Sequence, residues 1–393
     1  MNNQVIILGV PIDPLTMNQT LDRIEKFIKI GRETGKGHQV ATVNVDFITN
    51  ALSDPELLTL LQGADLAMPD GMPVVWSGRL LGVDFQERVA GVDMILGLAE
   101  RAAKEKYSIY LLGAAPGVAN RTAEILQDRY PELKIAGVCS PFVRSIAETD
   151  PGLLDDIRAA QPDILLVAFG NPKQEKWIGH FIHQLNVPVM IGVGGTFDLI
   201  SGIKKRAPGW MQRSGLEWSF RLAQEPGRLW RRYVRNIGIF SMHFLRQWWL
   251  MRAKRRGECQ IPVDNFCLNQ NTAVISLQHD LSIENVHLFT YIARQALEFT
   301  PYILIDLLIV SFLDSSAFGA IVELTRKARS LGGQLSLVNV PKKVQEEIRI
   351  LRLDQYLSTY TDFPTGLMAY QTLIQENEQL NRAAIFQLQV QTR

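Results

Sequence analysis

Short apolar runs alternate with amphipathic stretches over about the first 200 residues of the chain. The runs at 4–8, 39–43, 65–68, 108–112, 133–138, 163–168 and 188–192 have the length and composition of buried strands. Between them, Leu21, Ile24 and Ile28 recur at helical spacing, and 91–105 and 117–129 also have the pattern of amphipathic helices. Strands that alternate with helices predict a mostly parallel α/β sheet with helices on both faces.

The same alternation begins again near Asn265, after a basic stretch. Strands are predicted at 272–277, 302–309 and 334–339, and helices at 284–298, 316–330 and 341–351. The pattern therefore predicts a second, smaller α/β domain. The predicted boundaries are 1–202 for the first domain, 203–256 for a basic appendage, 257–264 for a linker, 265–370 for the second domain and 371–393 for a polar tail, frayed or disordered.

The composition limits the class of protein. Of the 393 residues, 47% are hydrophobic and 21% are charged, so the chain is not a disordered protein. Three cysteines are too few for a disulfide framework, which indicates a reducing compartment. The opening MNNQVIILGVPIDP lacks a basic region and predicts a first strand, not a signal peptide. No run approaches the roughly 20 apolar residues of a membrane span, so we expect a cytoplasmic protein.

The net charge of +1 conceals a strongly basic segment. Residues 203–256 contain 14 Lys and Arg but only two acidic residues, Glu217 and Glu225, together with five of the seven tryptophans. This asymmetry indicates a polyanion or an anionic membrane as partner. We expect no nucleic-acid partner, because Trp210 and Trp249 among Leu, Phe and Ile suit a lipid interface better than a base-reading groove.

Two predicted strand ends contain residues suited to catalysis. In ATVNVDF a strand leads into a helix through Thr42 and Asn44, where Asn44 either binds a ligand or only caps the helix. In AMPDGMP, Asp70 follows a strand and precedes Gly71. A carboxylate at such a position acts as a general base or holds a ribose, unless it only forms an Asp-Gly turn.

Further segments have features of a phosphate-binding site. Arg88 precedes a predicted helix and suits a diphosphate clamp. Gly113 lies before a helix in LLGAAPGVA, and Gln174 lies in a first helical turn in AFGNPKQEKWI. Gly194 and Asp198 follow a strand in IGVGGTFDLISG. Because helix N-termini present free N–H groups, these strand exits together predict a nucleotide site.

No metal or cofactor is predicted from the sequence. The chain lacks a D-x-D pair, and only His180 and His183, three apart on a predicted helix, have a metal-like spacing. No nucleophile elbow or Cys/His arrangement occurs. We therefore expect side-chain cations and backbone amides to stabilise a leaving group.

The runs AFGNPKQEKWI, GVGGTFDLISG and KKRAPGWMQRSGLEWSFRLAQEPGRLWRRY follow NVDFITNA and ADLAMPDGMP in one chain. In this combination the chain resembles the WecG/TagA/CpsF glycosyltransferase family over roughly residues 4–250. The resemblance implies a Rossmann-like fold and an inverting, metal-independent transferase. Its implied reaction moves N-acetylmannosamine, its uronic acid or a related sugar from a UDP-sugar to a polyprenyl-diphosphate-linked acceptor sugar, in cell-surface polysaccharide or teichoic-acid-type synthesis. We expect the enzyme peripherally on the inner face of the cell membrane, bound through 203–256.

The same resemblance implies roles for individual residues. It makes Asp70 the general base, with Thr42 opposite it. The residues that it implies for the UDP pocket are Asn44, Arg88, Gln174 and Asp198. The appendage arginines that it implies to close over the diphosphate at the membrane are Arg221, Arg228 and Arg231.

The second domain contains the run LIDLLIVSFLDSSAFGAIVELTRKARSLGGQLSLVNV. It resembles a STAS domain, the fold of anti-sigma-factor antagonists. The resemblance makes Ser315 the phosphorylated serine, and its place after Asp314 predicts an exposed hydroxyl at a helix N-terminus. Because Ala317 replaces the commoner glycine, docking of a protein partner or kinase without phosphorylation is an equal alternative, and Ser315 as a plain N-cap is another.

Two interpretations of the whole chain therefore stand. The first is a membrane-surface glycosyltransferase with a regulatory or docking STAS domain. The second is a STAS-based signalling protein whose first domain only senses a nucleotide sugar. Intact Asp70 and Thr42, with the appendage arginines, favour the enzyme.

Overall fold

The computed structural model describes residues 4–143, 145–252, 266–269 and 271–376. The chain folds into two compact units: the larger is Val10–Trp249, and the smaller combines residues 4–9 with those from Leu250 onward. The predicted linker and most of the predicted tail lie outside the described residues. None of the described helices is long and apolar enough to cross a membrane.

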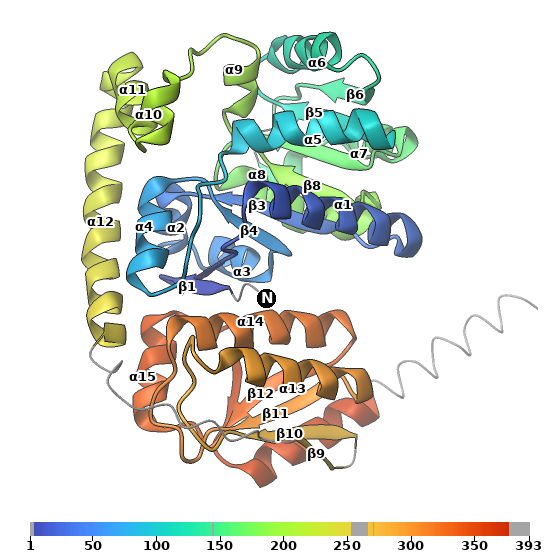
Figure 1. Cartoon of the computed structure of the whole chain (residues 1–393). Helices are drawn as coiled ribbons and strands as arrows, with labels where there is room; N and C mark the ends of the chain where they lie inside the picture. Colours follow the sequence, from blue (N-terminus) through green and yellow to red (C-terminus); the bar gives the residue numbers. More distant parts are fainter. Residues whose placement is uncertain (1–3, 144, 253–265, 270, 377–393) are drawn as a thin grey trace, which may run out of the picture. The chain divides into compact units, whose positions relative to one another are not determined.

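The larger unit contains a six-stranded parallel sheet with the order β4-β3-β8-β7-β5-β6 (Figure 1). Its strands are β3 (His38–Val43), β4 (Leu66–Pro69), β5 (Ser108–Gly113), β6 (Lys134–Cys139), β7 (Ile164–Ala168) and β8 (Val189–Gly192). All except the edge strand β6 are buried throughout, as in sheets that are covered on both faces. The predicted parallel α/β fold is confirmed, and each of these six strands ends within one residue of its predicted position. The strand predicted at 4–8 is not part of this sheet.

Helices cover both faces of this sheet. One face packs against α1 (Met17–Thr34), α5 (Gly91–Glu105), α6 (Val118–Arg129) and α9 (Thr196–Ile200). The other face packs against α7 (Pro151–Ala160) and α8 (Lys173–Leu185), around the fully buried Trp177. The shorter elements are β2 (Val10–Ile12), α2 (Val45–Ala51), α3 (Pro55–Gly63), α4 (Met72–Leu80) and the 3-10 turn η1 (Ile146–Glu148).

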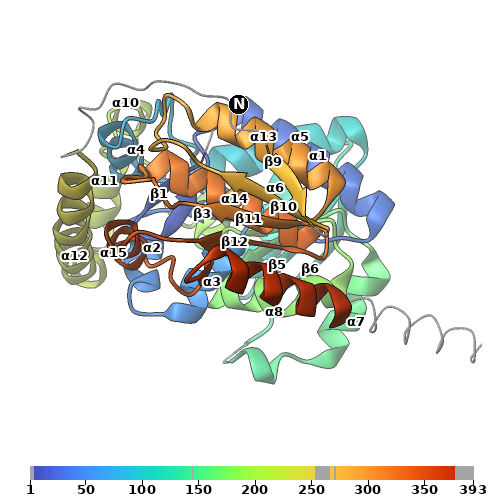
Figure 2. The same ribbon diagram turned by 90° about the horizontal axis from the view of Figure 1, so that it is seen from below.

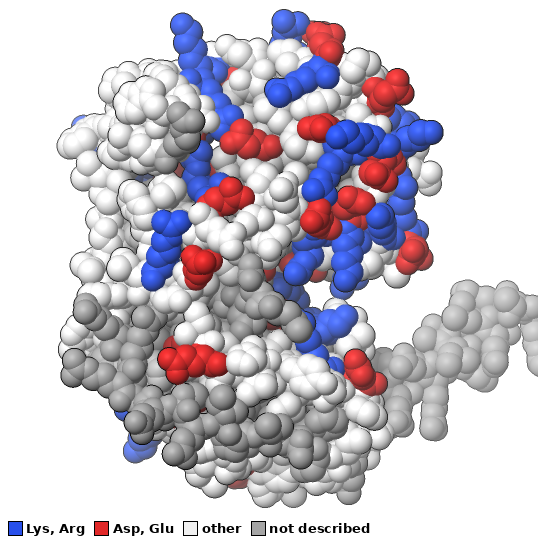
Figure 3. All heavy atoms as spheres, in the orientation of Figure 1, with Lys and Arg blue, Asp and Glu red and all other residues white. Residues whose placement is uncertain are grey.

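Acidic and basic side chains alternate over the outer surface of α1 and α5 (Figure 3). They form pairs one helical turn apart, such as Lys29 with Glu25 and Lys104 with Glu100, at 2.8 and 2.7 Å. Exposed pairs of this kind contribute only a few tenths of a kcal/mol each. This surface therefore shows no excess of either charge that would indicate a partner.

The appendage folds as the helices α10 (Gly209–Arg213), α11 (Glu217–Gln224) and α12 (Pro226–Arg252). One face of α12 is buried and includes Leu229, Phe240 and Phe244, whose two phenyl rings stack at 5.8 Å. The opposite face leaves a set of large apolar side chains exposed: Trp230, Val234, Ile237, Met242, Leu245 and Trp249. The helix is therefore apolar on two sides, of which only one is covered.

The smaller unit contains a five-stranded sheet with the order β13-β12-β11-β10-β9, parallel except for β9. Its elements are β9 (Phe266–Asn269), β10 (Thr272–Ser276), α13 (Val286–Phe299), β11 (Tyr302–Asp306), α14 (Ser315–Ser330), β12 (Gln334–Val338), α15 (Lys342–Ile350) and β13 (Ser358–Tyr360). A helix over 363–376 covers the face opposite α13 and α14 (Figure 2), and the predicted polar tail begins within it. The predicted second α/β domain is confirmed.

The strand predicted at 302–309 is shorter than its apolar run. It ends at Asp306, whose Oδ1 accepts the N–H of Leu308 at 3.0 Å and turns the chain. Leu308 and Ile309 are consequently exposed and are not part of the sheet. The hydrophobic pattern alone did not predict this turn, because Asp306, which forms it, lies inside the apolar run.

The predicted exposure of Ser315 is wrong. Its residue is only 2% exposed, and the N-cap of α14 is Asp314, whose Oδ1 accepts the N–H groups of Ser316 and Ala317 at 2.9 and 2.8 Å. Ser315 is therefore not the cap either. One turn further along, β1 (Val5–Ile7) passes so close that a β-carbon at Gly319 would collide with the preceding Gln4 carbonyl.

Candidate active site

Asp70 lies at the carboxyl edge of the parallel sheet, directly after β4. Its N–H donates to the carbonyl of Val43 at the end of β3, at 2.8 Å. Its Oδ1 accepts the N–H of Gly91, the first residue of α5, at 3.0 Å. A helix N-terminus favours a negative charge, so the sequence folds a carboxylate into a place that supports its ionised form.

Burial dominates the acidity of this carboxyl group. It raises the pKa of Asp70 to about 6, although Arg221, the Gly91 amide and Arg88 all act to lower it. An ionised carboxylate with a pKa near the working pH accepts a proton far more readily than an ordinary aspartate does. Asp70 is thus suited to general-base chemistry.

Thr42 lies on the neighbouring strand and is buried, whereas Asp70 is half-buried. Its Oγ1 donates to the carbonyl of Gly192 at 3.1 Å, which links β3 to the end of β8. A β-carbon at Gly91 would lie 3.7 Å from Cγ2 of Thr42 and 3.5 Å from Oγ1 of Thr196. Asp70, Thr42 and Thr196 therefore converge on one glycine.

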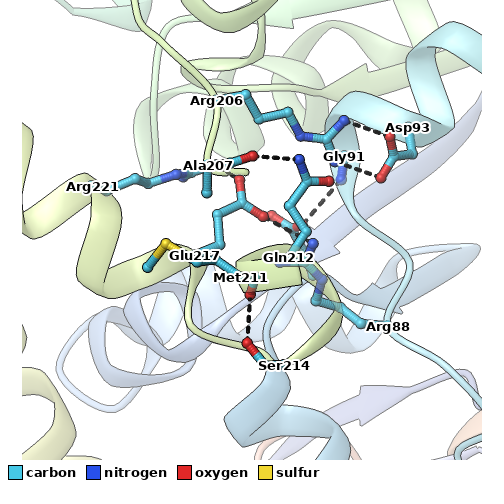
Figure 4. Close-up of polar contacts among 11 residues, drawn as sticks. Arg88, Gly91, Asp93, Arg206, Ala207, Met211, Gln212, Ser214, Glu217 and Arg221 are labelled. Carbon is cyan, nitrogen blue, oxygen red and sulfur yellow. Dashed lines mark hydrogen bonds and ion pairs between the residues drawn. The ribbon is translucent and has the colours of Figure 1, made fainter. Parts of the chain in front are cut away.

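Two arginines beside Asp70 share one carboxylate. Arg88, from the loop before α5, lies 2.9 Å from Oε2 of Glu217, and Arg221 lies 3.1 Å from its Oε1 (Figure 4). The Glu217 side chain is 6% exposed. Although burial opposes it, the nearby Arg221 and Arg88 hold the pKa of Glu217 below its usual value. The appendage thereby brings a second cation to the carboxyl edge of the sheet.

A further arginine fixes the appendage to α5. Arg206 makes two parallel hydrogen bonds of 2.6 Å to the carboxylate of Asp93. Gln212 of α10 donates to the carbonyl of Ala207 at 2.6 Å (Figure 4). Bidentate arginine–carboxylate pairs fix orientation as well as distance. The start of the appendage is therefore held against the helix whose N-terminus supports Asp70.

Gln174 is buried and joins two glycine-rich loops. Its Oε1 accepts the N–H of Gly170 at 3.1 Å and that of Gly194 at 2.9 Å, and its Nε2 donates to Glu175 at 2.7 Å. Burial raises the pKa of Glu175 to about 7, against the opposing hydrogen bonds from Gln174 and Asn171. In this conformation Gln174 positions the loops after β7 and β8, and its predicted contact with UDP stays a prediction.

The remaining predicted binding residues have structural partners of their own. Asn44 caps α2 by accepting the N–H groups of Asp46 and Phe47 at 2.9 and 3.3 Å, and its predicted contact with UDP stays a prediction. Asp198 lies 3.0 Å from Lys204. Gly113 has a φ of +100° at the end of β5, where a side chain would meet Ala168 at 2.9 Å.

The three predicted appendage arginines occupy different environments. Arg221 lies beside Asp70, whereas the side chain of Arg231 on α12 is exposed. Arg228 is also on α12, but its side chain lies outside the described part of the structure. A fourth arginine, Arg232, lies 3.3 Å from Asp46 and ties α12 to the start of α2.

Sequence reasoning missed Gly91 and Glu217. Glu217 had a signal, because it is one of only two acidic residues in the basic segment. Gly91 had none, because its importance lies in contacts between separate loops. Within the described residues, no group of three His, Cys, Asp or Glu side chains is placed to hold a metal ion.

A half-buried carboxylate beside two arginines, at the carboxyl ends of a parallel sheet, is an arrangement suited to group transfer from an anionic substrate. The family model "Glycosyl transferase WecG/TagA/CpsF family" matches residues 5–254. The chain therefore belongs to this family and is a glycosyltransferase. A second family model, the STAS domain, matches residues 268–365 and accounts for the smaller α/β domain.

Several relatives of the transferase part share the name N-acetylglucosaminyldiphosphoundecaprenol N-acetyl-beta-D-mannosaminyltransferase. The Bacillus subtilis protein is 38% identical over 61% of this chain and 91% of its own. A Staphylococcus aureus protein is 30% identical over 60% of this chain and 90% of its own. Among solved structures, an anti-sigma factor antagonist of Thermotoga maritima is 23% identical and covers 28% of this chain and 94% of its own, with a TM-score of 0.27.

Proposed function

We propose that the chain transfers N-acetylmannosamine, or a closely related sugar, from a UDP-sugar to N-acetylglucosamine on a polyprenyl diphosphate. The observation that carries the proposal is the half-buried Asp70, whose pKa burial raises to about 6, beside Arg88 and Arg221. The names of the relatives support this acceptor and this transferred sugar.

In the proposed reaction Asp70 takes the proton of the acceptor hydroxyl. The freed oxygen forms a bond to the anomeric carbon as the bond from that carbon to the diphosphate breaks, with inversion. Arg88 and Arg221 receive the negative charge that develops on the departing UDP. The Arg88 side chain is only 14% exposed, so little water screens its charge, whereas the Arg221 side chain is 46% exposed and its charge is screened more.

The test is release of UDP by the purified full chain. We expect release only when UDP-N-acetylmannosamine and a short-chain lipid-diphosphate N-acetylglucosamine are both present, with UDP-N-acetylglucosamine as the control donor. UDP-sugar binding without any release would favour the alternative of a nucleotide-sugar sensor. Release of UDP from UDP-N-acetylglucosamine and not from UDP-N-acetylmannosamine, with the acceptor present in both cases, would contradict the proposed sugar.

We also propose that α12 binds anionic membranes peripherally. Trp230, Val234 and Ile237 recur at spacings of four and three, so they share one exposed helical face, and Trp249 continues it. Arg231 follows Trp230 and adds exposed positive charge. An apolar face flanked by arginines suits the headgroup boundary of a bilayer.

The STAS domain is proposed as a docking or regulatory module. Because Ser315 is buried, docking without phosphorylation is the form that the structure favours. The exposed Leu308 and Ile309, in the loop that leads to α14, offer an apolar surface for a protein partner.

A further inference from the structure

Glu217 is the only acidic side chain that α11 directs toward the catalytic edge. It lies between Arg88 and Arg221, and its side chain is 6% exposed (Figure 4). Arg88 is also largely buried, with 14% of its side chain exposed. The Glu217–Arg88 pair is therefore unlike the exposed helix pairs on α1 and α5, in which both side chains are accessible to water.

Local helix stability does not account for this arrangement. Glu217 and Arg221 are four residues apart, but Arg88 comes from a distant loop. Burying a carboxylate between two arginines costs desolvation energy, and the stability of the helix does not require it. The arrangement does have a use if the two arginines must stay together until an anion arrives.

A sugar nucleotide brings such an anion. Its diphosphate has two adjacent charged phosphates, and guanidinium groups bind phosphate in the same planar geometry as carboxylate. We propose that Glu217 is an internal counter-anion, a positioning residue that holds Arg88 and Arg221 in the empty enzyme and yields them to the diphosphate of the donor. This inference rests on the proposed function, because it requires a diphosphate donor.

The inference has two measurable consequences. Removing the charge of Glu217 removes a competitor, so UDP binds more tightly to the arginine pair. The same substitution also changes the pKa of Asp70, the proposed base. Glu217 faces Asp70 together with Arg88, Arg206 and Arg221. Of these groups only Glu217 raises the pKa of Asp70, so its neutralisation lets Asp70 ionise at lower pH.

The experiment is calorimetric titration of the full chain with UDP. We expect E217Q to bind UDP about tenfold more tightly than the unaltered chain, which corresponds to about 1.4 kcal/mol. E225Q is the matched control, since it removes the same charge at the other end of α11, where Glu225 pairs with Lys204. We expect its affinity for UDP to stay within about twofold.

The second readout is the pH dependence of kcat. The acidic limb in E217Q should move to lower pH, whereas E225Q should leave it in place. A folded E217Q that binds UDP no more tightly overturns the inference. If E217Q does not fold, E217D withdraws the carboxylate by one methylene and should still tighten UDP binding; unchanged affinity there overturns it too. No UDP binding by the unaltered chain overturns the proposed function itself.

Discussion

Asp70 is held in a compromise between burial and charge. Burial favours its neutral form, whereas the Gly91 amide, Arg88 and Arg221 favour the carboxylate. The outcome is a pKa of about 6, so most of the carboxyl group is ionised at neutral pH. The residue could nevertheless be recognised from the sequence, because a carboxylate directly after a strand and before Gly71 is positioned by its local sequence alone.

Asp70→Asn should abolish the base while leaving the shape of the site intact. We expect kcat to fall about 10²- to 10⁴-fold, the usual contribution of a general base, with UDP affinity within a few fold. Asp84→Asn is the matched control, because Asp84 is exposed in the loop between α4 and α5. Near-normal turnover of Asp70→Asn would contradict the assignment.

The pH profile of the unaltered enzyme tests the same group independently. The raised pKa means that Asp70 is protonated, and cannot accept a proton, below about pH 6. We therefore expect kcat to rise as the pH increases through about 6 and then to level off. Steady-state UDP release between pH 4.5 and 8 measures this; a flat profile across that limb would assign the base to another group.

Gln174 shows how a buried side-chain amide holds together two loops that are far apart in the sequence. Gln174→Ala would leave the N–H groups of Gly170 and Gly194 without their acceptor. We expect a loss of about 1–3 kcal/mol in the free energy of unfolding, measured with urea. Gln184→Ala, on the exposed end of the same helix, should cost less than about 0.5 kcal/mol. Equal losses would contradict the role of Gln174.

At the scale of elements, apolar runs and periodicity were enough for the parallel strands of the larger unit, because all of them except the edge strand β6 are buried on both faces. They failed where a polar side chain redirects the backbone, as Asp306 does, and for short edge strands such as β9 and β13. In the site, Asp70 and Arg88 follow from their places at element ends. Glu217 does not, because its function depends on two arginines that only the folded chain brings together.

The exposed face of α12 is the element that should meet the membrane. Replacing Trp230 and Trp249 together with Ser removes two large apolar side chains that are 55% and 68% exposed. We expect sedimentation with vesicles of anionic lipid to fall at least threefold, while the helix itself persists because its buried face is unchanged. Phe142→Ser is the control, since Phe142 is 85% exposed in the larger unit outside the appendage. Unchanged sedimentation of the double variant would refute the assignment.

At the scale of the whole chain, the two units are not consecutive in sequence. Residues 4–9 belong with the smaller unit. Their backbone packs against α14 at Gly319, where a β-carbon would collide with the carbonyl of Gln4. Asp70, Arg88 and Glu217 all belong to the larger unit. Stability of the smaller unit and catalysis should therefore be separable.

Gly319→Ala tests this separation. A methyl group there would collide with the carbonyl of Gln4, so either residues 4–8 or α14 must shift. We expect faster hydrogen exchange at the buried Val5, Ile6 and Ile7 and about 1–3 kcal/mol less stability of the smaller unit, as for other overpacked sites. The matched change Gly238→Ala has open space on α12 and should do neither. With kcat expected to stay within about twofold, a collapse of turnover in folded Gly319→Ala would show that the STAS domain is part of the catalytic unit.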